Sequence, residues 1–217
     1  MRKDIGPNKL SDVKTIYIQT HLQGTAILDV GCGQGHYSTW LKMQQPSLSI
    51  TAIDHLVLPD TQDFMYLQLD LEQAIPLPDN SFDTILAFDI IEHIAQEASF
   101  INQLHRLCKP GGMLVGSVPH DNDAFLPAYN LTFYHRSDLT HKRYYVPASL
   151  EKALNTAGFS VVTLDGKGGV SPQVIAEFFP APLRTLVKKT VGLLRRGGII
   201  RTDRLQSDLF FVAKKVH

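Results

Sequence analysis

Three glycines at alternate positions follow an acid that ends a short apolar run, in the order Asp29, Gly31, Gly33 and Gly35. A helical pattern of side chains begins directly afterwards, at His36. A buried strand, a glycine turn and a helix form a unit that brings its backbone close to a ligand, because a Cβ in the turn would block that approach. These residues therefore predict a cofactor site where the strand ends. A tight turn that binds nothing is the alternative.

The glycine spacing separates two classes of cofactor. Dinucleotide sites use G-x-G-x-x-G, whose third glycine lets the helix and the strand pack closely. In this chain His36 takes that third position, and the extra glycine, Gly35, precedes it. The Asp-x-Gly-x-Gly-x-Gly run resembles the first motif of class I S-adenosylmethionine-dependent methyltransferases. Two alternatives stay open: an NAD-dependent oxidoreductase, and a cofactor-binding scaffold that lacks a working acceptor site.

Acids also end or follow three later apolar runs of strand length, at Asp54, Asp70 and Asp89. Parallel strands bring their carboxyl ends to one edge of a sheet, where ligands bind in α/β folds. A carboxylate at the end of the second strand can accept hydrogen bonds from both ribose hydroxyls of a cofactor. We therefore expect Asp54 to bind a ribose, with a strand-end cap as the plainer interpretation. Asp83 is expected to be structural.

Two further segments resemble the same family. Asp-x-x-Glu-His, residues 89–93, precedes an expected helix that ends at Lys-Pro-Gly-Gly, residues 109–112. The pair resembles the branch of the family that methylates small molecules and lipids, and all the matching blocks together cover residues 26–118. The resemblance implies that Asp70 accepts from the adenine amino group. It also implies a cofactor site made of Asp29, Gly31, Cys32, Gly33, Gly35, Asp54, His55, Asp70, Leu71, Phe88 and Asp89.

The composition favours a globular protein without a nucleic-acid partner. The 217 residues, 44% hydrophobic and 19% charged, suffice for one domain with a sizeable core. Lys plus Arg equals Asp plus Glu at 21 each, which argues against the positive field of a nucleic-acid-binding protein. We expect no signal peptide and no membrane span. Cys32 and Cys108 suggest neither a disulfide framework nor a metal site, so we expect a cytoplasmic protein.

The side-chain periodicity predicts one α/β domain over residues 1–217. We expect helices at 8–22, 36–43, from after residue 93 to 108, and at 147–157, and strands at 26–30, 49–53, 64–69, 84–88, 113–118, 159–164 and 208–214. The resemblance implies a Rossmann-like, doubly wound seven-stranded sheet in the order 3-2-1-4-5-7-6, with the last strand antiparallel. Two segments depart from the pattern: an acceptor-side loop at 119–146 and a lid-like insertion at 166–206.

Methyl transfer to a hydroxyl requires a group that takes up the hydroxyl proton, and histidine does this at neutral pH. The candidates are His93, His120 and His141, and for each of them a surface or hydrogen-bonded histidine is the plainer interpretation. His141 is preferred, because the Thr140-His141 segment resembles one near the acceptor in ubiquinone-type and sugar-type O-methyltransferases. The resemblance implies a small-molecule, sugar or lipid-linked acceptor.

Asp89, Glu92 and His93 offer a different chemistry. At positions i, i+3 and i+4 of one helix they would share a face. Some ubiquinone-pathway and small-RNA-end methyltransferases hold a divalent ion with Glu-x-x-Glu-His, but here Asp89 shortens the first ligand. We therefore expect no metal ligand, and activity without an added divalent ion.

A basic amphipathic run at 183–196 lies inside the lid-like insertion. Its apolar residues recur at helical spacing, and the rest of its surface is mostly basic, through Arg184, Lys188, Lys189, Arg195 and Arg196. Two interpretations are open. Either the helix packs its apolar side on the domain, or it is a lid or membrane-surface helix that recruits an apolar or lipid-linked acceptor.

Overall fold

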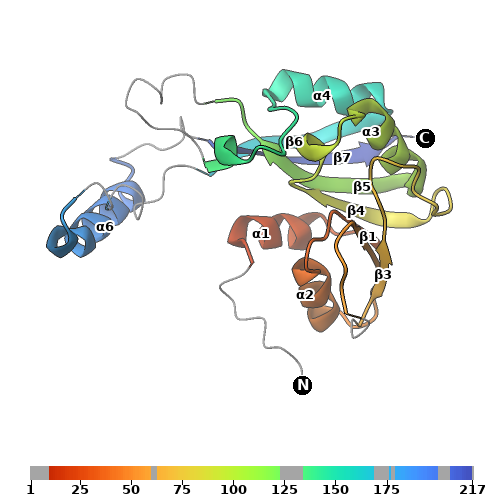
Figure 1. Ribbon diagram of the computed structural model, residues 1–217, viewed down its shortest axis with the longest axis horizontal. Helices are drawn as coiled ribbons and strands as arrows, with labels where there is room; N and C mark the ends of the chain where they lie inside the picture. Colours follow the sequence, from red (N-terminus) through yellow and green to blue (C-terminus); the bar gives the residue numbers. More distant parts are fainter. Residues whose placement is uncertain are drawn as a thin grey trace.

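The computed structural model describes residues 10–59, 63–122, 134–168, 176, 179–199 and 206–216. Its centre is a seven-stranded sheet in the order β3-β2-β1-β4-β5-β7-β6 (Figure 1). The strands are β1 (Ala26–Val30), β2 (Ser49–Asp54), β3 (Met65–Gln68), β4 (Phe82–Phe88), β5 (Cys108–Pro119), β6 (Phe159–Lys167) and β7 (Asp208–Lys215). The pairs among β1 to β5 are parallel, and β7 is antiparallel to both its neighbours. The expected strand order and the antiparallel last strand are confirmed.

Among the described residues, two helices cover each face of the sheet (Figure 1). One face carries α1 (Asp12–His21) and α2 (His36–Gln44), and the other carries α3 (Glu97–Leu107) and α4 (Pro147–Thr156). Ile27 and Leu28, adjacent in β1, are both fully buried but belong to the two opposite cores. Strands covered on both faces must be apolar at successive positions, which explains the continuous apolar runs of the sequence.

The shared helix face expected for residues 89, 92 and 93 is not observed. Asp89 has a φ of +52°, and its backbone N–H still pairs with the Ser117 carbonyl at 2.9 Å, at the edge of β5. One 3₁₀ turn, η2 (Ile91–His93), follows, and α3 begins only at Glu97. Asp89, Glu92 and His93 therefore do not share a helix face, because a left-handed residue at 89 cannot start an α-helix.

The Lys-Pro-Gly-Gly segment also differs from expectation. It was predicted to end the helix before a strand at 113, but β5 already begins at Cys108. Cys108 pairs with Phe82 and Met113 with Thr84, so β5 has several extra residues between these two pairs. Among these extra residues Gly111 has a φ of +78°, a conformation that glycine adopts without the steric cost of a Cβ.

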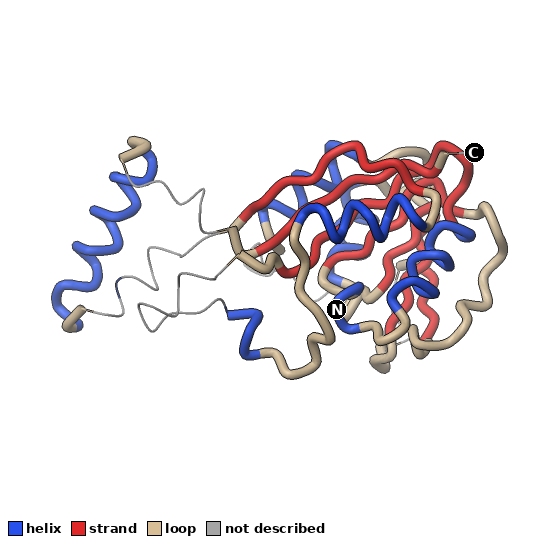
Figure 2. Tube along the Cα trace, turned by 90° about the horizontal axis from the view of Figure 1, so that it is seen from above, coloured by secondary structure: helices blue, strands red, loops and turns tan. Residues whose placement is uncertain are grey.

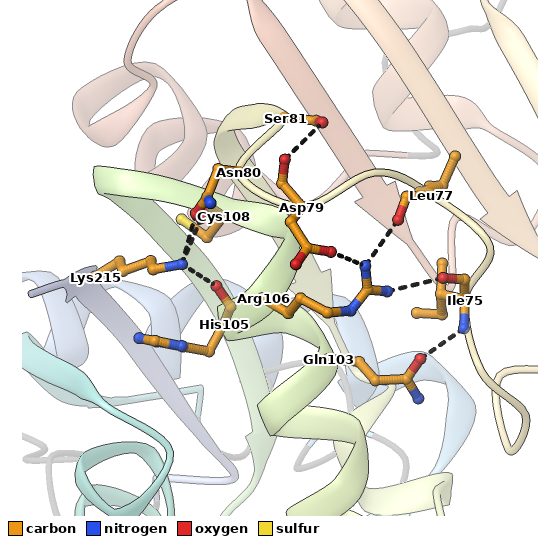
Figure 3. A network of polar contacts seen from close by, with 10 residues as sticks. All are labelled: Ile75, Leu77, Asp79, Asn80, Ser81, Gln103, His105, Arg106, Cys108 and Lys215. Carbon is orange, nitrogen blue, oxygen red and sulfur yellow. Dashed lines mark hydrogen bonds and ion pairs between the residues drawn. The ribbon is translucent and has the colours of Figure 1, made fainter. Parts of the chain in front are cut away.

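A polar network fixes the link between β3 and β4 to α3 (Figure 3). Arg106 of α3 donates to the carbonyls of Ile75 and Leu77, both at 2.8 Å, and pairs with the Asp79 carboxylate at 2.5 Å. At the other end of the network the buried Lys215 ammonium donates to Asn80 and to two carbonyls at the end of α3. The link that leads away from Asp70 is thus held against the body of the domain.

The basic run forms α6 (Ala181–Arg196), which stands apart from the sheet and its covering helices in both views (Figures 1 and 2). Leu186 and Leu193 are 62% and 70% exposed. These two leucines are therefore not packed on the part of the domain that the structure describes. None of the helices that the structure describes is both long and apolar enough to span a bilayer.

Candidate functional site

The glycine turn leaves open space at the end of β1. The φ angles of Gly31, Gly33 and Gly35 are +69°, +56° and +70°, a region that residues with a Cβ rarely adopt. A Cβ on Gly31 would also lie 2.6 Å from the Ile90 side chain, whereas a Cβ on Gly33 would meet no atom within 4 Å. Glycine at 33 is therefore required by its conformation alone, and the backbone there faces free space that a ligand can fill.

Asp54 holds this turn in place from the end of β2. Its carboxylate is only 7% exposed and accepts from the Gly33 backbone N–H at 2.7 Å and from the Leu56 N–H at 3.0 Å. His55 lies beside it, with Nδ1 3.0 Å from the Asp54 carboxylate and its own side chain 78% exposed. A carboxylate has about four acceptor positions, so Asp54 can bind hydroxyls as well as the turn.

Asp29 is buried behind the same turn. The Ser38 hydroxyl of α2 donates to its carboxylate at 2.6 Å. Burial raises the pKa of Asp29 to about 6, because few groups replace the lost solvation of the charge. A cation brought to this edge would stabilise the ionised form. Cys32, in the turn itself, is a half-buried free thiol whose pKa is raised by burial.

The other expected cofactor residues line the ends of β3 and β4. Asp70 is exposed, and its carboxylate accepts from the Glu72 N–H at 3.0 Å. Leu71 and Phe88 are buried. Asp83, at the opposite end of β4, accepts from the N–H groups of the segment that enters β1, which confirms its structural role.

Lys14 is a site residue that the sequence patterns did not indicate. Its ammonium reaches from α1 to the Asp89 carboxylate and lies 5.5 Å from the centre of the Phe88 ring. Burial lowers the pKa of Lys14, but the charge and the hydrogen bond of Asp89, together with other nearby groups, outweigh this, so the pKa is raised and the group stays cationic. Lys14 lies three and four residues before the buried Tyr17 and Ile18, which places it on the inner face of α1, but the sequence spacing alone does not indicate that face.

The structure brings together Glu92, His93 and His141, with one ligand atom of each lying within 4.8 Å of the others. The two imidazole rings meet edge to face, 4.6 Å between their centres. Asp89, expected in this group, instead accepts from Lys14 and from the Ser117 hydroxyl. Among the described residues, Glu92 Oε2 and His141 Nδ1 are buried without a hydrogen-bond partner. We call Glu92, His93 and His141 the acceptor-side cluster.

Thr140 and Asp138 set the protons of the two histidines. The single hydroxyl proton of Thr140 is donated to Asp138 Oδ1 at 2.6 Å, so the same oxygen accepts from His93 Nδ1 at 2.9 Å. His141 Nε2 lies 3.6 Å from the other Asp138 oxygen, which favours a proton on Nε2. Burial and then His93 lower the pKa of His141. This assignment leaves lone pairs on His93 Nε2 and His141 Nδ1, of which His141 Nδ1 is buried without a hydrogen-bond partner among the described residues.

His120 is not part of this cluster in its contacts. Its side chain is buried at the end of β5, and Nδ1 lies 3.1 Å from the Gln206 carbonyl. Its backbone pairs with Ser207 and Tyr145. His120 thus joins the ends of β5 and β7, and the structure groups only His93 and His141 among the three candidate bases.

The acceptor-side cluster also has the donors of a divalent cation site, two imidazoles and a carboxylate. The orphaned Glu92 Oε2 fits such a group, because a cation would satisfy it. Without one, burial and then the Asp89 charge hold the pKa of Glu92 well above its ordinary value. The expectation that the site holds no metal stays a prediction.

Comparisons with known proteins show the family of this chain. Residues 7–164 match a family described as a methyltransferase domain. The chain is 30% identical over 162 residues to the ubiquinone biosynthesis O-methyltransferase of Paracidovorax citrulli, covering 67% of each chain. It is 29% identical over 182 residues to the protein of the same name from Neisseria meningitidis, covering 75% of this chain and 74% of that one.

Solved structures share the fold. A putative methyltransferase from Bacillus halodurans superposes with a TM-score of 0.64 at 20% identity, covering 95% of this chain and 100% of that one. A Burkholderia thailandensis 1,6-didemethyltoxoflavin-N1-methyltransferase, with 1,6-didemethyltoxoflavin and S-adenosylhomocysteine bound, gives 0.60 at 15% identity, covering 94% and 76%. The family match rules against the NAD-dependent oxidoreductase considered from the glycine spacing.

Proposed function

This chain belongs to the class I S-adenosylmethionine-dependent methyltransferases, and from that premise we propose that it methylates a hydroxyl oxygen of a small-molecule, sugar or lipid-linked acceptor. The observation that carries the proposal is the pair of imidazole lone pairs on His93 and His141, which suit removal of a hydroxyl proton. Two relatives named as O-methyltransferases support the choice of oxygen. We assign residues 1–217 to one cytoplasmic catalytic domain, with 119–146 and 166–206 on its acceptor side.

The cofactor, S-adenosylmethionine, supplies an electrophilic methyl group on a sulfonium when it is bound. In the proposed arrangement Asp54 accepts from the ribose hydroxyls and Asp70 from the adenine amino group. The open backbone at Gly33 passes close to the methionine portion, and Asp29 lies behind the turn as a negative charge. The Lys14 ammonium is positioned to pair with the methionine carboxylate, since it already binds one carboxylate at this edge.

Proton removal is assigned to the acceptor-side cluster, with His141 as the preferred base and His93 beside it. The pKa of His141 is lowered, so the ring is neutral at physiological pH and can take a proton. Asp138 then faces the developing imidazolium on the opposite nitrogen, as a carboxylate behind a catalytic histidine does. His120, which is tied to the Gln206 carbonyl, is the weakest of the three candidates.

A divalent cation at the same cluster is a second candidate, favoured by the buried, unpartnered Glu92 Oε2. Glu92, His93 and His141 would hold it, and its charge would lower the pKa of an acceptor hydroxyl. Treatment with a chelator distinguishes the divalent cation from proton removal by the histidines alone. We expect turnover to be unchanged after treatment with a chelator, because neutral imidazoles can act alone. Activity that is lost in the chelator and restored by magnesium would instead identify the three residues as metal ligands.

The proposal is tested with the full chain and cofactor labelled on the methyl group. We expect label transfer to at least one acceptor in a panel of phenols, sugars and polyprenylated phenols, with the label released under conditions that cleave methyl ethers. Transfer only to amines would contradict the oxygen acceptor. Tight cofactor binding with no transfer to any member would favour the non-catalytic scaffold.

A further inference from the structure

Helix α6 is the most basic segment of a neutral chain. Its 16 residues hold five of the 21 Lys and Arg residues, and no acid occurs between residues 179 and 199. Such a concentration of one sign of charge favours an anionic partner.

The apolar and basic residues of α6 lie on opposite sides. At about 100° per residue, the apolar side chains fall within an arc of roughly 160°. Leu183, Leu186 and Leu193 on this arc are 46%, 62% and 70% exposed. The remaining surface is basic, and Arg184 and Lys189 fall near the two borders of the arc. Long basic side chains at such borders can reach charged headgroups while the leucines enter an apolar layer.

No described element covers this apolar face, since α6 stands clear of the sheet and of α1 to α4 in both views (Figures 1 and 2). The ends of the helix are marked by two more exposed apolar side chains, Phe179 at 41% and Ile199 at 74%. A patch with this many exposed apolar side chains needs a partner.

The segment that carries α6 leaves the sheet at the edge where the site lies. Lys167, the last residue of β6, pairs with Asp208, the first of β7, and Asp208 also pairs with Pro119 at the carboxyl end of β5. Asp89 pairs with the same end of β5 through Ser117. A surface bound by α6 is therefore connected to the edge at which an acceptor must arrive.

We propose that α6 is an interfacial helix that docks the enzyme on an anionic phospholipid surface. A bilayer takes both faces at once, with the leucines at the acyl boundary and the basic side chains among the headgroups. An acidic protein bound to the basic side would leave the leucines in water, and a second copy bound through the leucines would bring two basic helices together. Docking deepens the proposed function because it names where a lipid-linked acceptor is met, but it does not depend on turnover.

Vesicle co-sedimentation of the full chain tests this without cofactor or acceptor. We expect binding to vesicles of phosphatidylcholine mixed with phosphatidylglycerol, weakened by salt, and little binding to phosphatidylcholine alone. Lys188→Gln with Lys189→Gln should weaken binding about thirtyfold. The matched control, Lys152→Gln with Lys214→Gln, removes the same charge at exposed positions of α4 and β7 and should bind like the wild type.

The apolar face is tested by Leu186→Ser with Leu193→Ser, with circular dichroism to confirm that the fold is kept. Loss of vesicle binding in this variant, with turnover of a water-soluble acceptor retained, supports the proposal. Three results overturn it: negligible binding of the wild type to the mixed vesicles, equal loss in the lysine pair and its control, or self-association without lipid that the leucine changes abolish. The last would assign the face to a second copy. Failure to methylate any acceptor, with vesicle binding intact, would contradict the proposed function alone.

Discussion

The glycine turn and the acceptor-side cluster lie at the same edge of the sheet but are held by different kinds of contact. The turn is fixed by two adjacent strands and by one carboxylate, Asp54, that accepts from its backbone. The cluster is assembled from two segments far apart in the chain, joined by the Lys142 N–H to the Glu92 carbonyl at 2.8 Å and by Arg143 to the Ile94 carbonyl at 2.5 Å. The first is set by adjacent strands of the sheet and the second by hydrogen bonds between two loop segments.

Because the two regions are held by different contacts, we expect single substitutions to affect either turnover or cofactor affinity, but not both. His141→Ala should lower kcat by about 10²–10⁴-fold, because a positioned base is lost, and His93→Ala should lower it by less, while cofactor affinity stays near normal in both. His120→Ala is the matched control and should have a much smaller effect on kcat, since its ring binds the Gln206 carbonyl. Steady-state kinetics with calorimetry of cofactor binding measures both. Near-normal turnover in His141→Ala would show that the base assignment is wrong.

Substitutions on the cofactor side should instead lower the affinity for the cofactor. Asp54→Ala is expected to weaken S-adenosylmethionine binding by about 1–3 kcal/mol, because a charged group loses its hydrogen-bond partners, and the Gly33 N–H loses its acceptor as well. Glu151→Ala, at an exposed acid on α4, serves as the control. Calorimetry of each variant provides the comparison. Unchanged affinity in Asp54→Ala would show that Asp54 does not bind the ribose and only holds the turn.

What could be predicted from the sequence follows the same division. The strands and the positions of Asp54 and Asp83 depended on local spacing and on apolar runs, which the backbone reproduces, while the strand order and the antiparallel last strand were implied by the family resemblance. The expected shared helix face of residues 89, 92 and 93 was wrong because one left-handed residue, Asp89, ends the strand and redirects the chain. No spacing rule places His141 beside His93, because their contact depends on Thr140 and on loop geometry.

The surroundings of Lys14 and α6 could not be predicted for a related reason. The inward direction of Lys14 depends on which face of α1 meets the sheet, which the weak amphipathicity of that helix does not reveal. The apolar residues of α6 were correctly predicted to lie on one side of a helix. Their spacing does not indicate whether protein or a non-protein surface covers that side.

On the cofactor side, Asp29 should have a smaller effect, on the pH dependence of the free energy of unfolding. Its folded-state pKa of about 6 exceeds the unfolded value near 4, so the folded protein binds more protons between these values. The contribution of Asp29 to the free energy of unfolding is thus most favourable at acid pH and is lost as pH rises from about 4 to about 6. Asp29→Asn, which can still accept from Ser38, should be more stable than the wild type by about 1–3 kcal/mol at pH 8.

Urea unfolding of the ligand-free protein at about pH 4 and about pH 8 measures this. The advantage of Asp29→Asn should disappear at the acid pH, whereas Glu151→Gln, at an exposed position, should show no such dependence. A stability difference for Asp29→Asn that is the same at both pH values would mean that the charge is already balanced in the folded protein.

The most direct measurement is a crystal structure with S-adenosylhomocysteine bound, since it places the sulfur against both regions at once. We predict that the ribose hydroxyls meet the Asp54 carboxylate and that His93 and His141 are the histidines facing the sulfur, with Lys14 turned from Asp89 to the methionine carboxylate. A sulfur that faces His120, or a ribose that leaves Asp54 bound only to the turn, would contradict the account.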